Sequence, residues 1–416
     1  MTSRRGLVAL AASGLLPLAA CGAGEPERPA HRPLSVIYIA GDPAGPWAQR
    51  TEGLADGVKI AIAERDGLIG DRAASTAVVP IEQRDGDQVS AAIGTGRILR
   101  DSRTLGVLGT YSADQLEISA PQLNGGELAL LQYGTGMRGL LAAERQGEPG
   151  RYQPSGRSLA ARGVPSDEAL AEAVGDIPQI DGTPTVLVAT EWWKQQRRLT
   201  RDAAAAAKRA REAAVADGKT GDELPPLSPG NARSMFTPVN DATRIGDALR
   251  AVTNGSATER TTNGRQVVVI NPTEPDPAAV ARRIARRSSG LLVLVDGADR
   301  AIPAAAVAGH HGPVYRVRRT LADATTPAAT ALRAKERALF GRDRADAVVA
   351  GYRAAKRMLE LAAAQPDKTI DRLAYASQLV ADAPTQAQLP IRNGQILLGG
   401  VVVERLSGSR WVAAGR

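Results

Sequence analysis

The sequence predicts an α/β protein with a parallel, doubly wound sheet. Two observations carry this prediction: short apolar runs alternate with amphipathic segments of helical length, and the pattern repeats three times before a fourth strand. In this first part the predicted strands are residues 35–40, 77–81, 105–109 and 128–131, and the predicted helices are 49–65, one ending near 101 and one beginning at 112. At 416 residues, the chain is long enough for two domains of ordinary size.

The stretch 104–135 places two strand ends beside the start of a helix. Ser112 and Gln115 have the spacing of a capping box, which satisfies two free backbone N–H groups at a helix start. Ligands of open parallel sheets sit at the carboxyl ends of strands, and a helix N-terminus favours an anion there. We therefore expect the hydroxyl groups that follow these strands, including those of Tyr111, Ser112, Tyr133 and Thr135, to face a ligand.

The second part of the chain alternates in the same way around an irregular stretch. The predicted strands are 159–163, 185–190, 267–270, 291–295, 313–316, 395–398, 400–405 and 410–413. The predicted helices are one opening at Pro165, one ending near 216, and 276–287, 303–308, 328–339, 346–363 and 369–380. Residues 217–264 are rich in Pro and Gly, which predicts a long surface excursion with a helix around 242–252.

Cys21, the only cysteine of the chain, follows a short leader. Arg4 and Arg5 precede an apolar stretch that is too short for an ordinary transmembrane helix. Leu18-Ala19-Ala20-Cys21-Gly22 looks like a bacterial lipobox, in which the cysteine is diacylated and becomes the new N-terminus. We expect a signal peptide over 1–20, exported by the Sec or twin-arginine route, and a flexible lipidated tether over 21–33. This would anchor the protein on the extracytoplasmic face of the cell membrane.

Composition and motifs exclude several classes of function. The net charge of +8 suits a protein held near an anionic lipid surface, and the lack of a basic stripe interleaved with aromatic residues argues against nucleic-acid binding. The histidines are His31 and the adjacent pair His310-His311, and no catalytic or metal-binding motif is present. We therefore expect no enzyme activity, metal or cofactor. A glycosidase that uses only carboxylates would need two acids converging in a different architecture.

One glycine-rich segment resembles a dinucleotide-binding loop. Gly134-Thr135-Gly136-Met137-Arg138-Gly139 fits Gly-x-Gly-x-x-Gly after a predicted strand. Such a loop needs a helix directly behind it and an acid about 20 residues further on. Because a loop follows here, we interpret these glycines as hinge and turn residues.

The order of several short patterns resembles that of the solute-binding lipoproteins of branched-chain amino acid ABC transporters, which have the type I periplasmic-binding-protein fold. The patterns are the lipobox, Asp42-Pro43-Ala44-Gly45, Asp66-Gly67-Leu68-Ile69-Gly70, Asp85-Gly86-Asp87, Gly109-Thr110-Tyr111-Ser112, Arg162-Gly163-Val164-Pro165-Ser166-Asp167, Ala350-Gly351-Tyr352 and the closing strands. The resemblance covers nearly the whole mature chain and is weakest over 217–264.

This resemblance implies two lobes, joined by three hinge crossings, that close on a ligand. Lobe one would hold 34–150 and 312–385, and lobe two would hold 151–311 and 386–416. Tyr111, Ser112, Tyr133 and Thr135 fall where the family binds an α-carboxylate. Trp192 or Trp193 falls near its lobe-two aromatic residue, and Asp296 falls near the strand end that faces an ammonium group. The alternatives are core packing for one tryptophan and a turn with Gly297 for Asp296.

The function that this implies is capture of a small polar solute, an amino acid or a related compound, for an ABC importer. Hinge closure would stabilise the loaded state, and the permease would be the partner. The alternative is a sensor or scaffold lipoprotein with a degenerate pocket that binds a membrane protein. Two features favour it: the carboxylate loop is reduced to Tyr111-Ser112, and the excursion 217–264 is present. Trp192-Trp193-Lys194, which replaces a Tyr-Gly pair of the family, argues against an amino acid as the ligand.

Overall fold

The structure is a computed structural model of the full chain. It describes residues 34–44, 47–70, 72–82, 88–136, 140–141, 151–166, 303–365 and 370–414, and between 167 and 302 it describes residues 169, 173, 177, 185–189, 208–209, 211–217, 219, 236–239, 266–269, 282, 285–286 and 292–296. The predicted leader, Cys21 and the tether lie outside these ranges. Among the described helices, none is both long and apolar enough to cross a membrane.

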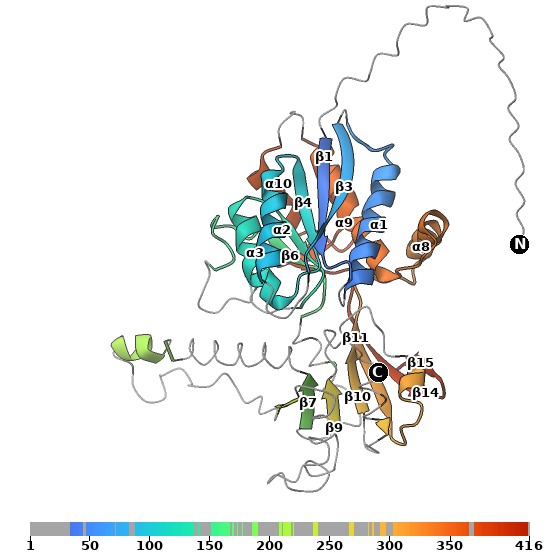
Figure 1. The fold of residues 1–416 in the computed structure, drawn as a ribbon. Helices are drawn as coiled ribbons and strands as arrows, with labels where there is room; N and C mark the ends of the chain where they lie inside the picture. The colour runs from blue at the N-terminus through green and yellow to red at the C-terminus, as the bar shows by residue number, and fades with distance from the viewer. Residues whose placement is uncertain are drawn as a thin grey trace, which may run out of the picture. The chain divides into compact units, whose positions relative to one another are not determined.

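The first sheet has eight strands in the order β12-β13-β6-β5-β4-β1-β3-β2. Figure 1 labels β1, β3, β4 and β6 of this sheet. Their bounds are β1 Leu34–Gly41, β2 Leu68–Ile69, β3 Arg72–Pro80, β4 Thr104–Gly109, β5 Leu130–Gln132, β6 Ala160–Arg162, β12 Ile391–Arg392 and β13 Gln395–Ile396. The central strands pair in parallel, and only β2 and β12 at the two edges pair antiparallel. This confirms the parallel sheet that the alternating apolar runs predict.

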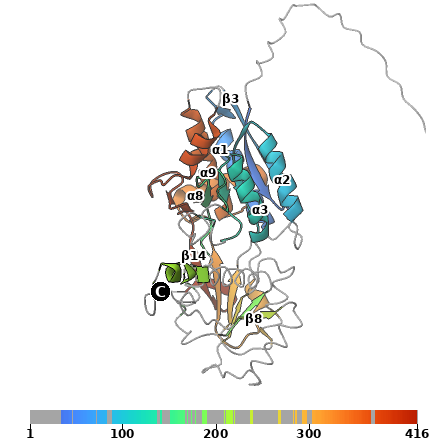
Figure 2. The ribbon, with the colours of Figure 1, turned by 90° about the vertical axis from the view of Figure 1, so that its left-hand side faces the viewer.

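Six described helices cover the two faces of this sheet. They are α1 Ala48–Ala63, α2 Gln88–Arg100, α3 Ala113–Gly125, α8 Pro327–Phe340, α9 Asp346–Ala363 and α10 Arg372–Val380. Buried residues of α1, α9 and α10, such as Leu54, Met358 and Tyr375, share one apolar cluster. Buried residues of α2 and α3, such as Ile98 and Leu116, share a second cluster on the opposite face, and Figure 2 shows α2 and α3 side by side.

Close backbone contact between α1 and α9 explains one of the predicted patterns. A Cβ atom on Gly351 would lie 2.3 Å from the carbonyl oxygen of Leu54. No side chain fits at that distance, so only glycine lets these two helices approach so closely. The Ala350-Gly351-Tyr352 pattern therefore marks the place where α9 meets α1.

The second sheet has seven strands in the order β15-β14-β11-β10-β9-β7-β8. Their bounds are β7 Thr185–Ala189, β8 Phe236–Val239, β9 Gln266–Val269, β10 Leu292–Asp296, β11 Val314–Arg319, β14 Val401–Ser407 and β15 Arg410–Ala413, and the short helix η3 Ala304–Ala306 follows β10. Strands β7 to β11 pair in parallel, and the final hairpin adds antiparallel strands. Strand β8 lies inside 217–264, where the sequence predicts an excursion without a strand. The helix predicted around 242–252 lies outside the described residues.

Following the described strands in order, the chain passes between the two sheets three times, but the crossings are displaced from the predicted boundaries. Strand β6 belongs to the first sheet, although the boundary at 150/151 assigned it to lobe two. Strand β11 belongs to the second sheet, although 312–385 was assigned to lobe one. Strands β12 and β13 return to the first sheet, although 386–416 was assigned to lobe two. The crossings therefore lie after β6, between β11 and α8, and between β13 and β14.

Candidate functional site

The ends of β4 and β5 lie side by side, as the sequence predicts. Gly109 pairs with Gln132 at the end of the two strands, and the N–H of Tyr133 donates to the carbonyl of Gly109 at 2.6 Å. Beyond the strands, the N–H of Thr135 donates to the carbonyl of Tyr111 at 3.1 Å. The Gln132 side-chain amide donates to the same carbonyl at 2.8 Å. The two segments therefore stay together past the edge of the sheet.

Helix α3 begins at this edge with the predicted capping box. The Ser112 hydroxyl accepts from the N–H of Gln115 at 3.3 Å, and the Gln115 carbonyl oxygen accepts from the N–H of Ser112 at 3.0 Å. The Gln115 amide also donates to the carbonyl of Glu82, which follows β3, at 2.9 Å. Ser112 is half-buried, and its hydroxyl hydrogen is not used in the cap. The helix start is thus fixed to the ends of β3 and β4.

The structure corrects the prediction that the hydroxyls of Tyr111 and Tyr133 face a ligand. Both side chains are fully buried, Tyr111 in the cluster with α2 and α3, and Tyr133 in the cluster with α1 and α9. Burial raises the pKa of Tyr111 to about 12, against a lowering effect of the nearby hydroxyls of Thr95 and Ser119. Burial also raises the pKa of Tyr133. These tyrosines are core residues, and their backbone, not their hydroxyls, shapes the strand ends.

Two residues of α1 that sequence reasoning missed hold the same edge together. The buried guanidinium of Arg50 donates to the carbonyl of Tyr133 at 2.7 Å and to that of Gly134 at 3.2 Å. The hydroxyls of Thr51 and Thr110 are hydrogen-bonded at 2.7 Å, which ties α1 to the end of β4. The available signal was the polar Arg50-Thr51 pair in the first turn of α1, the helix that follows β1 after a short loop. Thr135, 8% exposed, lies next to the carbonyls that Arg50 holds.

The site residues predicted for the second lobe are only partly placed. Asp296 is the last residue of β10, and its cross-strand neighbour in β11 is Arg318. The structure describes the backbone of Asp296 but not its side chain, and Trp192 and Trp193 lie outside the described residues. In the described part of the chain, no group of three or more His, Cys, Asp or Glu residues is arranged to hold a metal ion.

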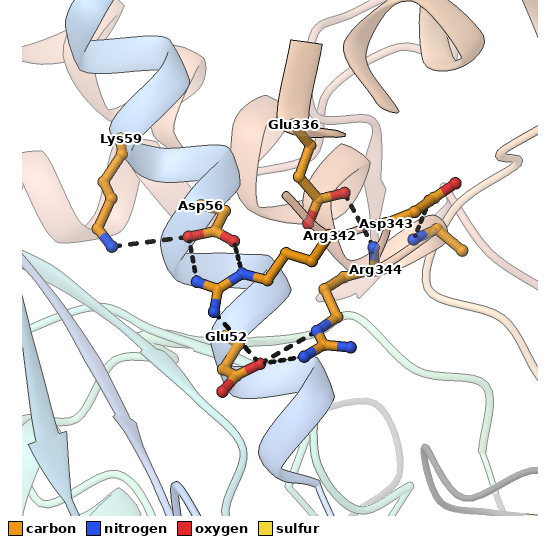
Figure 3. A network of polar contacts seen from close by, with 8 residues as sticks. Glu52, Asp56, Lys59, Glu336, Arg342, Asp343 and Arg344 are labelled. Atoms are coloured by element: carbon orange, nitrogen blue, oxygen red, sulfur yellow. Dashed lines mark hydrogen bonds and ion pairs between the residues drawn. The ribbon is translucent and has the colours of Figure 1, made fainter. Parts of the chain in front are cut away.

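A network of charged side chains, not predicted from the sequence, joins α1 to the connection between α8 and α9 (Figure 3). The Arg342 guanidinium donates to both oxygens of the fully buried Asp56 at 2.6 and 2.9 Å. Arg344 donates to Glu52 at 2.6 Å, and its backbone N–H donates to the buried Glu336 at 2.9 Å. The second oxygen of Glu336 has no hydrogen-bond partner among the described residues. These contacts fix the α8–α9 connection on α1.

Burial is the main reason that the pKa of the Glu336 carboxyl is raised. The hydrogen bond from the Arg344 N–H lowers the pKa, and the negative charges of Asp56 and Asp343 raise it further. Arg342 lowers it by a smaller amount. Glu336 is therefore the acid of this network whose ionised form the fold disfavours.

The chain matches no protein-family profile and no curated protein sequence. Its fold is nevertheless similar to crystal structures of ABC transporter substrate-binding proteins. One from Desulfitobacterium hafniense, solved with leucine, is 13% identical with a TM-score of 0.56, over 92% of this chain and 100% of that chain. A leucine-binding protein from Thermotoga maritima is 14% identical with a TM-score of 0.56, over 92% of this chain and 98% of the other.

A third example is a branched-chain amino acid transporter substrate-binding protein from Streptococcus pneumoniae, solved with isoleucine. It is 12% identical with a TM-score of 0.53, over 89% of this chain and 99% of that chain. Identities this low establish the shared fold rather than a shared ligand. The chain has the two-lobed α/β fold of the type I periplasmic binding proteins.

Proposed function

We propose that this protein is an extracytoplasmic solute-binding protein that captures a small polar solute, an amino acid or a related compound, for an ABC importer. The main support is the agreement of its fold, over about nine-tenths of the chain, with substrate-binding proteins of such importers. The adjacent ends of β4 and β5, with Ser112 at the start of α3, supply hydroxyl and backbone groups where open sheets bind ligands. No catalytic step is part of the proposal.

The proposed mechanism is a hinge movement. The two domains, each built around one of the two sheets, close about the three crossings that join them. A solute that contacts both domains binds the closed arrangement more tightly than the open one, and so shifts the population toward it. On the first sheet we propose Ser112 and Thr135 as the contacts. On the second we propose Asp296 and one of the two tryptophans, Trp192 or Trp193. Arg50 and Gln132 would position the first pair through the backbone of residues 111 and 133–134.

A thermal-shift screen of the protein against amino acids, amides, aromatic acids and polyols tests this proposal. A solute present at 100 times its Kd adds about 2.7 kcal/mol to the free energy of unfolding, which raises Tm. We expect at least one class of solute to do so, in a concentration-dependent manner. A complete screen without any rise in Tm would argue against solute capture.

We further propose that the protein is a lipoprotein anchored through Cys21. Cys21 is the only acylation candidate, and stable anchoring needs two acyl signals, which a diacylated cysteine supplies. Cys21→Ser is expected to leave the fold unchanged, because the described fold begins at Leu34, and to move the protein from the detergent phase to the aqueous phase in phase separation. Retention of the serine variant in the detergent phase would refute the anchor.

One observation favours a second candidate, a sensor or scaffold lipoprotein whose pocket has degenerated. Two of the four hydroxyls predicted for the first-lobe site, those of Tyr111 and Tyr133, are buried in the core. This candidate predicts no thermal shift with any solute, and binding of a membrane protein that persists when Ser112 is replaced. The solute screen therefore separates the two candidates.

A further inference from the structure

The third crossing, residues 397–400 between β13 and β14, is hydrogen-bonded directly to the second crossing. The N–H of Thr320 donates to the carbonyl of Gly400 at 2.8 Å, and the N–H of Gly400 donates to the Thr320 hydroxyl at 2.9 Å. Three residues later, the N–H of Asp323 donates to the carbonyl of Leu398 at 2.9 Å. The second and third crossings therefore form one paired unit where the chain leaves both sheets.

The first crossing, which begins after β6, is held by a residue at the start of the same segment. The Gln395 side-chain amide nitrogen lies within hydrogen-bond distance of the carbonyls of Arg162, at 2.8 Å, and Val164, at 3.2 Å. The Gln395 carbonyl oxygen accepts from the Arg162 guanidinium at 2.9 Å. Arg162 is 3% exposed and Gln395 is half-buried, so these contacts are partly shielded from water. One side chain thus holds both the end of β6 and the start of the first crossing.

The segment 395–400 is consequently bonded to both of the other crossings. Its beginning holds the first crossing through Gln395, and its end holds the second through the pairing of Thr320 and Gly400. The second crossing is also attached to α9, because the N–H of Leu321 donates to the Asp346 carboxylate at 2.6 Å. If the first or the second crossing changes direction, the hydrogen bonds of segment 395–400 therefore transmit that change to the other.

We propose that Gln395 is a positioning residue for domain closure: it couples the first crossing to the paired second and third crossings, so that all three bend together. The inference rests on the proposed function only in assuming that the domains move. Its physical basis is that three separate polypeptide crossings, left uncoupled, would each bend independently and permit a wide range of arrangements. A shared set of hydrogen bonds restricts them to one hinge axis.

The test measures the distance between the two domains without any solute. Because Cys21 is the only cysteine, the full chain carrying Cys21→Ser offers a background for two introduced cysteines, at the exposed Arg97 of α2 and the exposed Arg410 of β15. Nitroxide labels at these positions give a distance distribution by electron paramagnetic resonance. Gln395→Met removes every hydrogen bond of the amide at similar volume, and Gln388→Met, at an exposed glutamine of the same region, is the matched control.

We expect Gln395→Met to broaden the distance distribution relative to the parent, and Gln388→Met to leave it unchanged. If Gln395→Met does not fold, Gln395→Glu replaces it, because the carboxylate still accepts from Arg162 but cannot donate to the carbonyls of Arg162 and Val164. A lower Tm with an unchanged distance distribution, in whichever variant folds, would overturn the proposal and leave Gln395 a structural residue. Since no solute is used, a failed solute screen does not affect this outcome.

Discussion

Ser112 has two roles that can be measured separately, one in the fold and one in the proposed site. Ser112→Ala removes the hydroxyl that accepts from the N–H of Gln115, and loss of such a cap costs about 1 kcal/mol of stability. If the hydroxyl also donates to an anionic group of the solute, the variant loses a further ~1.5–3 kcal/mol of binding energy, or roughly tenfold to a hundredfold in affinity. Denaturation without solute measures the first loss, and calorimetry measures the second.

The matched control is Thr326→Ala, which removes the equivalent cap of α8. The Thr326 hydroxyl accepts from the N–H of Ala329 at 3.2 Å. This variant should lose a similar amount of stability, about 1 kcal/mol, without any change in solute affinity. Equal affinities for the Ser112 and Thr326 variants would exclude Ser112 from the solute site while leaving the fold assignment intact.

Glu336 makes stability depend on pH in a defined direction. Burial raises its pKa in the folded state, so its protonated form is favoured by folding. The stability that folding gains from protonated Glu336 is fully present below the pKa of this carboxyl in the unfolded state. It is lost as pH rises through the pKa of the folded state. Glu336→Gln removes the ionisable carboxyl group and puts a neutral amide in its place, where one carboxylate oxygen has no hydrogen-bond partner among the described residues. We expect a gain on the order of 1 kcal/mol at pH 7, and no gain below pH ~4.

The measurement is urea denaturation of both proteins between pH 4 and pH 8. The free-energy difference between Glu336→Gln and the parent should grow with pH across this window. A constant difference, or a parent that is the more stable of the two at pH 7, would show that the Glu336 carboxylate is compensated in the fold. Asp343, whose pKa its hydrogen bonds with Arg333 hold below its usual range, makes stability depend on pH only below about pH 5, and it is present in both proteins.

At the residue scale, the sequence predicts interactions between residues that are close together in the chain. It misses interactions between residues that are far apart in the chain. The capping box of Ser112 and Gln115 is a local pattern, and the structure confirms it. The burial of Tyr111 and Tyr133 depends on packing against helices far along the chain, so the hydroxyls were assigned to the wrong environment. Arg50 was missed for the same reason, since its acceptors lie 83 and 84 residues away.

At the scale of elements, the charged network makes the contact between α1 and the α8–α9 connection depend on Arg342. Arg342→Met keeps most of the side-chain volume but leaves the carboxylate of Asp56 buried without its main partner. Loss of one partner of a buried pair costs about 3–5 kcal/mol, because an uncompensated charge remains in the interior. The control is Lys59→Met: Lys59 lies 3.6 Å from Asp56 but its side chain is 45% exposed, so its loss should cost at most ~1 kcal/mol.

Both variants are compared by denaturant unfolding at pH 7. A loss of less than about 1 kcal/mol for Arg342→Met would mean that water reaches Asp56 when the guanidinium is gone. The network would then be a surface feature and not part of what holds α8 and α9 on α1.

Most elements are visible in the sequence because their apolar pattern is local and strong. Helix α9 occupies 346–363, as predicted, and β1, β4 and β10 differ from their predictions by one or two residues. Strand β8 was missed because Pro238 interrupts a run of only four residues. It lies at the edge of its sheet, where a proline is tolerated because one side of the strand needs no ladder bonds.

At the scale of the whole molecule, Gly399 sets how closely the second and third crossings approach. A Cβ atom at this position would lie 1.9 Å from the carbonyl oxygen of Thr320. Gly399→Ala must therefore push the crossings apart, and we expect a loss of about 1–3 kcal/mol of stability, as for other overpacked sites. Gly400→Ala is the control, because a Cβ atom there would have no heavy atom within 4 Å.

Thermal unfolding of the two alanine variants checks this prediction. Equal Tm values for Gly399→Ala and Gly400→Ala would show that the crossings can separate without loss of stability. That result would also weaken the proposed coupling through segment 395–400.

The number of crossings follows from the resemblance, but their positions do not follow from the sequence. An apolar strand such as β11 has the same composition in either sheet, so its pattern cannot assign it to one lobe. Strands β12 and β13 have only two residues each and return to the first sheet through Gln395, whose partner Arg162 is 233 residues away. Such long-range pairing is what displaced the predicted boundaries.

Solute capture as proposed requires that a small solute binds this fold and changes the arrangement of its two domains. The most direct measurement is the distance between nitroxide labels at positions 97 and 410 of the Cys21→Ser protein, with and without a solute that raises Tm. We predict that a saturating solute replaces the solute-free distribution with a single, narrower one at shorter distance. A solute that raises Tm but leaves the distribution unchanged would contradict closure, and the absence of any such solute would contradict solute capture.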